Sequence, residues 1–180
     1  QFFAALTVKS FTHEENKSLL QVVLGNSYNK SLCARGAGGI NSWVCDNLQI
    51  AGEIKFMRKH TSNVWQDLDE LLSKVVMNAG PAFEKGMEDA ARMREIGLDN
   101  DEAFEIMGVA FGNHVVKPQQ LTLVRDEWLN PSYDEFLPRS AWSLYNCFTE
   151  GLKRGPISLL PDRTASFNDF FMKEVVTVEA

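Results

Sequence analysis

The sequence predicts an α+β fold, with an antiparallel β-meander in the N-terminal third followed by several packed α-helices. In residues 1–60, short apolar runs alternate with clusters of turn-forming residues, whereas from residue 61 onward apolar residues recur at three- and four-residue spacing. No internal repeat, low-complexity tract or Pro/Gly/Ser-rich linker interrupts the 180 residues. We therefore expect a single domain over residues 1–180, with strands mostly in 1–60, helices mostly in 61–155 and an irregular tail over 156–180.

Three or four strands are expected in the N-terminal third. Residues 19–24 form a short apolar, partly β-branched run that ends at the turn formers of residues 25–29. Residues 40–45 form a second run before an Asp-Asn turn. Residues 53–60 alternate in character, which predicts a strand with Ile54, Phe56 and Arg58 on one side and Lys55, Met57 and Lys59 on the other.

Capping residues and apolar spacing predict the helices that follow. A first helix begins near Thr61 or Ser62 and ends at residues 78–81, and Pro81 begins a second helix that Gly97 stops. Asp99 caps a third helix over 101–111, with Glu102 completing a capping box. Shorter helices are predicted over residues 119–128 and 139–153.

The glycine-rich string of residues 35–39 (Arg-Gly-Ala-Gly-Gly) is the most prominent short motif in the sequence. A P-loop requires a following Gly-Lys-Ser/Thr and a helix, and a dinucleotide site requires GxGxxG, and both are missing here. The string therefore predicts a bend or bulge where two backbones approach closely, with a phosphate contact as the alternative.

Composition favours a protein of the cytoplasm. No run approaches the roughly 18 apolar residues of a membrane span, and the N-terminal residues lack the basic flank of an export signal. The three cysteines, Cys33, Cys45 and Cys147, have no CxxC spacing, which argues against a disulfide framework and against a zinc finger.

No catalytic, metal or cofactor site is predicted. His13, His60 and His114 are far apart and form no HxxxH or HExxH pair, and no GxSxG elbow is present. We expect His60 either to anchor the turn before the first helix through a backbone hydrogen bond or to donate to a phosphate. An enzyme assembled from dispersed Asp, His and Ser residues remains a third hypothesis for the function.

Charge is distributed unevenly, which bears on possible partners. The chain has 18 Lys and Arg against 24 Asp and Glu, for a net charge of −6. Residues 1–60 hold seven bases and four acids, a net +3, so the other 120 residues carry −9. Basic and aromatic residues on a sheet can hold single-stranded nucleic acid. The candidates are Arg35, Lys55, Arg58, Lys59 and His60 for phosphate and Trp43 or Phe56 for base stacking; alternatively, the two aromatics face the core and the bases are merely solvated.

Acidic residues concentrate in residues 84–105, where eight acids stand against three bases. This stretch would repel a polyanion. It predicts a protein-binding helical face, with nucleic-acid mimicry as one mode of binding, that comprises Glu84, Glu88, Asp89, Asp99 and Glu102.

Four strings resemble a family of phage- and plasmid-encoded proteins of unknown function, usually called "phage/plasmid-like protein". They are residues 26–32, residues 39–48 with Gly52-Glu53, residues 58–61 and the late string Ser-Ala-Trp-Ser-Leu-Tyr-Asn-Cys-Phe-Thr-Glu at residues 140–150. The resemblance implies a mobile-element origin and a bacterial cytoplasm. The order of elements is also similar to that of phage single-strand annealing proteins, and a homo-oligomer would allow the two charges to lie on opposite faces.

Two functional hypotheses follow, with the enzyme as the third. The leading one is a non-enzymatic accessory protein of a phage or plasmid that binds single-stranded nucleic acid through the N-terminal sheet. Its rival is a module that binds a host or phage protein through the acidic face. Trp142, Asn146 and Thr149 of the late string, together with Asn47, either belong to a site or are buried residues that fix the fold.

Overall fold

The chain divides into two compact units, and the division falls inside a helix. The computed structural model describes residues 2–13, 18–27, 33–42, 47–59, 64–156 and 159–177. Its units are Gln1–Met87 and Glu88–Ala180, and the boundary lies within helix α1 (Val64–Glu95). The boundary lies in a continuous helix, so no linker marks it in the sequence. For this reason the sequence alone predicts a single domain. The predicted α+β class is confirmed.

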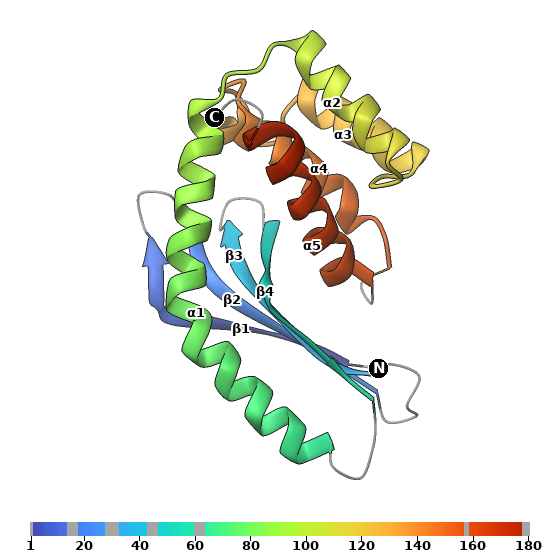
Figure 1. Ribbon diagram of the computed structural model, residues 1–180. Helices are drawn as coiled ribbons and strands as arrows, with labels where there is room; N and C mark the ends of the chain where they lie inside the picture. The colour runs from blue at the N-terminus through green and yellow to red at the C-terminus, as the bar shows by residue number, and fades with distance from the viewer. Residues whose placement is uncertain are drawn as a thin grey trace. The chain divides into compact units, whose positions relative to one another are not determined.

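The first unit contains a four-stranded antiparallel sheet (Figure 1). Its strands are β1 (Phe2–His13), β2 (Ser18–Asn26), β3 (Ala34–Ser42) and β4 (Asn47–Arg58), and each pairs with the next in the order β1-β2-β3-β4. This is the meander that the alternating runs and turns predict, because short connections join neighbouring antiparallel strands.

The first part of α1 packs on one face of this sheet. Leu20 of β2 is fully buried and packs against Ala79 and Phe83 of α1. Val22 and Leu24, the next two residues on the same face of β2, pack against Val75 and Ala82. The alternate apolar residues of β2 therefore pack against the apolar stripe of α1, and this contact forms the core of the first unit.

The glycine-rich string lies in β3, opposite a bulge in β4. Ala37 pairs with Lys55 of β4, but Gly39 pairs with Ile50, so the register shifts between these two residues of β3. On the other side of β3, Gly36 and Gly38 pair with Leu24 and Val22, the residues that face α1. A bulge is present as predicted, but its extra residues, 51–54, lie on β4 opposite the string. Gly36 and Gly38 themselves lie where the sheet packs against the helix.

One helix replaces the two that the sequence predicts between residues 61 and 97. Pro81 lies inside α1 and does not end it. A proline there removes one backbone hydrogen bond and costs about 3 kcal/mol in an exposed helix. Pro81 itself is exposed, whereas Ala82 and Phe83 beside it are buried. The apolar residues of α1 on both sides of Pro81 pack against the sheet, and this packing offsets the lost hydrogen bond. Tertiary contacts therefore keep the helix continuous despite the proline.

The second unit consists of helices. After the last turns of α1 come α2 (Asn100–Gly112), α3 (Pro118–Leu129), the 3-10 turn η1 (Asp134–Phe136), α4 (Ala141–Lys153), α5 (Leu160–Phe171) and the π-helical turn η3 (Met172–Val176). The helices predicted near 101–111, 119–128 and 139–153 are confirmed. The irregular tail predicted over 156–180 is wrong, because residues 160–171 form α5. Pro161 lies in the first turn, where a proline is tolerated, and Phe167 and Phe171 are fully buried.

Helix α4 forms the centre of the second unit, since every residue from 141 to 149 is buried. The ring of Tyr145 lies 4.9 Å from that of Phe167 and 5.4 Å from that of Phe171. Nδ2 of Asn146 donates to the carbonyl of Trp142 at 2.8 Å, and Oγ1 of Thr149 donates to the carbonyl of Asn146 at 2.9 Å. These polar residues of the late string are buried inside the helix bundle, where they stabilise the fold.

Across the described ranges, no helix combines the length and the apolar character that crossing a membrane requires.

Candidate functional site

The basic residues predicted to bind nucleic acid are described only in part. Arg35 is half-buried in β3, and Arg58 and Lys59 are exposed at the end of β4. Lys55 and Phe56 lie within β4. Trp43 and His60 fall outside the described residues.

The strand register places Arg35 and Arg58 on opposite faces of the sheet. Arg35 pairs with Met57, and Arg58 pairs with Ala34, so the two arginines occupy positions of opposite parity. The position of Arg58 is the one that faces α1. There the pKa of Glu70 is lowered, mainly because Nζ of Lys74 donates to it at 2.6 Å, and the charge of Arg58 adds a smaller effect. A nucleic-acid strand lying on one face would meet only one of these two arginines.

The predicted acidic face is also divided. Glu84 lies in the first unit, whereas the other four residues lie in the second. Asp89 is only 8% exposed, and its charge helps to raise the pKa of the buried Tyr145 after the larger effect of burial and that of Asp169. The exposed acids of the second unit that remain are Glu88, Asp99 and Glu102.

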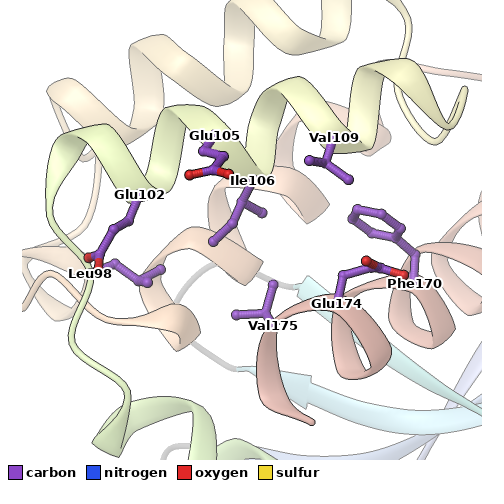
Figure 2. A pocket seen from close by; sticks show the side chains of 8 residues that line it. All are labelled: Leu98, Glu102, Glu105, Ile106, Val109, Phe170, Glu174 and Val175. Atoms are coloured by element: carbon purple, nitrogen blue, oxygen red, sulfur yellow. The ribbon is translucent and has the colours of Figure 1, made fainter. Parts of the chain in front are cut away.

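Glu102 lines a groove in the second unit, between α2 and the C-terminal helix, which is formed by α5 and η3 (Figure 2). The groove has a volume of about 340 Å³. Its lining has two kinds of side chain. Five are apolar and three are carboxylates: Leu98, Ile106, Val109, Phe170 and Val175, with Glu102, Glu105 and Glu174.

The capping box at the start of α2 fixes one end of the groove. Oδ1 of Asp99 accepts from the backbone N–H of Glu102 at 2.9 Å, and Oε2 of Glu102 accepts from the backbone N–H of Asp99 at 2.8 Å. This arrangement sets where α2 begins and holds the Glu102 side chain at the groove. The sequence predicts the capping box, and the structure confirms it.

Helical spacing produces the two walls. On α2, the residues that face the core are Ala103, Met107 and Ala110, and the flank beside them carries Glu102, Ile106 and Val109 at i, i+4 and i+7. On the opposite wall, Phe170 and Glu174 are four residues apart across the junction of α5 and η3, so they lie one above the other. In Figure 2, Val109 points toward Phe170, and Ile106 points into the space between the two helices.

The groove is strongly acidic. Its lining holds three carboxylates and no Lys, Arg or His. Nζ of Lys173 contacts Glu174 at 2.6 Å, but this lysine is 80% exposed, so solvent screens the pair. Glu105 is exposed and has no ion-pair partner among the described residues. The site therefore combines a mostly apolar lining with unneutralised negative charge.

Sequence reasoning missed most of this site. Glu102 is one of the predicted acidic residues, and Glu105 lies on the same predicted helix. Phe170, Glu174 and Val175 were missed because the segment that carries them was predicted to be irregular. Their four-residue spacing is the signal that could have indicated a helix there.

The described part of the chain has no group of three or more His, Cys, Asp or Glu side chains arranged to bind a metal ion. Comparison of the chain with family models, with curated proteins and with solved structures finds no match.

Proposed function

We propose that the second unit is a protein-binding module, and that the groove between α2 and the C-terminal helix holds a basic amphipathic helix of a partner protein. One observation carries this proposal: five apolar side chains and three carboxylates line the groove, and no base lines it.

The chemistry of the lining selects the partner. An amphipathic helix places apolar side chains at i, i+3, i+4 and i+7 into a groove of this kind. Lysines or arginines on the flanks of such a helix would lie near Glu102, Glu105 and Glu174. Exposed ion pairs contribute only about 0.2–1 kcal/mol each, so the apolar contacts supply affinity, while the charges select the partner and speed association. Nucleic acid and acidic peptides are disfavoured here for the same reason.

The test uses three labelled peptides of equal length. The first repeats Leu and Lys at helical spacing, the second has the same composition in scrambled order, and the third replaces every Lys with Glu. Fluorescence anisotropy with the full chain should show binding of the first peptide, weaker binding of the second and none of the third. Binding of the first should weaken as salt is added. Equal binding of the first and scrambled peptides would contradict the proposal.

A matched pair of variants locates the binding. Glu105→Lys reverses a charge in the groove, whereas Glu95→Lys makes the same change at an exposed position at the end of α1, outside the groove. Glu105→Lys should weaken binding of the Leu/Lys peptide about tenfold, equivalent to 1.4 kcal/mol, and Glu95→Lys should leave it nearly unchanged. Equal losses in the two variants would mean that only the overall charge matters.

Single-stranded nucleic-acid binding by the first unit is a second proposal, for a protein of a phage or plasmid in a bacterial cytoplasm. Its support is the strand register, in which Arg35 and residue 55 occupy neighbouring positions of the same parity. Anisotropy with a labelled single-stranded oligonucleotide and its duplex should show a preference for the single strand and a steep loss with salt. Arg35→Glu should reduce binding more than Arg58→Glu. Binding that survives Arg35→Glu and the triple change Lys55→Glu/Arg58→Glu/Lys59→Glu in a folded protein would rule it out.

A further inference from the structure

A second pocket of the same unit has the opposite electrostatic character. It has a volume of about 270 Å³ and lies where residues that follow α2, the start of α3 and the start of α5 come together. The polar residues that line it include His114, Lys117, Gln120 and Arg163, and Asp162 is its one acid. Unlike the groove, it presents mainly hydrogen-bond donors.

The side-chain amide of Gln120, a residue that lines this pocket, has a donor without a partner. Gln120 is only 6% exposed. Its Oε1 accepts from the backbone N–H of Lys117 at 3.1 Å, which fixes the orientation of the amide, because only the oxygen can accept. Its Nε2 is buried and has no hydrogen-bond partner. A buried donor without an acceptor is costly, so a ligand acceptor that reached Nε2 would offset that cost.

The guanidinium of Arg163 belongs to the same lining and lies near the Gln120 amide. A methyl group built on Gly155 would lie 2.8 Å from Nη1 of Arg163 and 3.7 Å from Nε2 of Gln120, so both donors lie close to Gly155. Arg163 is half-buried and makes no ion pair within the described residues. Its charge is therefore available to a ligand.

Two helix N-termini add to the positive potential. Helices α3 and α5 each have 12 residues, and both begin at the pocket, with Lys117 as the N-cap of α3 and Asp162 in the first turn of α5. The lining carries a formal charge of +1 with His114 neutral, because it holds two bases, Lys117 and Arg163, and one acid, Asp162. Free backbone N–H groups at a helix start favour anions.

We infer that this pocket binds the phosphate group of a small molecule. A phosphate has enough acceptor oxygens to meet the Gln120 amide, the Arg163 guanidinium and the Lys117 ammonium together, and Arg163 can bind it through two parallel hydrogen bonds. The volume leaves room for a small organic part. His114 and Ser166 also line the pocket, but no hydrogen bond joins them within the described residues, so no activated serine is formed.

The test follows the Gln120 side-chain amide by NMR. Its Nε2–H₂ resonances are assigned from their loss in Gln120→Glu, and the ¹⁵N-labelled full chain is titrated with inorganic phosphate, glycerol 3-phosphate, acetate and chloride at constant ionic strength. Phosphate or glycerol 3-phosphate should shift these resonances saturably below roughly 20 mM. Tighter binding of glycerol 3-phosphate would identify a phosphate ester as the ligand, and tighter binding of inorganic phosphate would identify the free anion. Acetate binding as tightly as phosphate, or no saturable shift with either phosphate, would overturn the inference.

Three variants show whether the pocket is responsible. Arg163→Gln should weaken phosphate binding at least about tenfold, because it removes the charge and the paired donors. Arg154→Gln removes an exposed arginine at the end of α4, outside the lining, and should leave binding unchanged. Gly155→Ala changes no charge but places a methyl group against Arg163 and Gln120, and it should also weaken binding. Equal weakening by Arg163→Gln and Arg154→Gln would reduce the effect to general surface charge and overturn the inference.

Discussion

Gly151 allows α3 and α4 to approach closely, and replacing it with alanine should destabilise the second unit. A Cβ at this position would lie 2.9 Å from Cγ2 of Val124 and 3.2 Å from the carbonyl oxygen of Gln120. The carbonyl belongs to the backbone of α3 and cannot rotate away, and Val124 is fully buried. Overpacking of this kind costs about 1–3 kcal/mol. Alanine recovers about 1 kcal/mol through its higher helix propensity. The net loss should be about 1–2 kcal/mol, because the backbone contact places the cost in the upper part of its range.

Gly108 of α2 provides the matched control. It is exposed, and a Cβ there would meet nothing within 4 Å, so Gly108→Ala should stabilise the protein by about 0.5–1 kcal/mol. Both variants are measured by urea unfolding in a Trp43→Phe/Trp65→Phe background, in which fluorescence comes only from Trp128 and Trp142 of the second unit. With a slope of about 2 kcal/mol per molar urea, Gly151→Ala should lower the midpoint by roughly 0.5–1 M. A Gly151→Ala protein as stable as the parent would refute the close approach of the two helices.

Two further predictions concern stability. Asp99→Ala removes the N-cap of α2 and one half of its capping box, and it should lower the free energy of unfolding by about 0.5–2 kcal/mol in the same urea assay; no change would mean that the box does not hold the helix start. Burial, followed by the charges of Asp169 and Asp89, raises the pKa of Tyr145, so its folded state keeps a proton that the unfolded chain loses above about pH 10. The wild-type free energy of unfolding should therefore fall with rising pH above that point by about 1.4 kcal/mol per unit more than that of Tyr145→Phe, and parallel curves would contradict this.

Local sequence rules were sufficient wherever the determinant was local. The capping box of Asp99 and Glu102 predicts the start of α2 because both partners lie within four residues. The glycines of β3 predict a close approach of backbones with a bulge, because a missing side chain leaves room for it, and the register shift lies beside these glycines, with its extra residues on β4.

The rules failed where packing decided the outcome. Pro81 predicts a helix boundary, but contacts of Val75, Ala82 and Phe83 within the first unit keep α1 continuous. Residues 160–171 show only weak local preferences, and α5 forms because Phe167 and Phe171 pack around Tyr145 of α4. Such long-range contacts cannot be read from spacing alone.

The candidate site could be predicted only in part for the same reason. Glu102 and Glu105 are visible as acids on a predicted helix, but their groove needs Phe170 and Glu174 from a helix that the sequence barely indicates. The phosphate pocket was not predicted at all. Its donors, Lys117, Gln120 and Arg163, come from two helices and meet only after folding.

The most direct test of the proposed function is a methyl NMR titration of the full chain with the Leu/Lys peptide. Binding in the groove should shift the methyl resonances of Ile106, Val109 and Val175, which line it. Leu72 in α1 and Leu137 after η1 are exposed leucines outside the groove, and their resonances should remain in place. Shifts at Leu72 and Leu137 as large as those of the groove methyls would mean that the peptide binds exposed apolar side chains without selectivity, and would contradict the proposal.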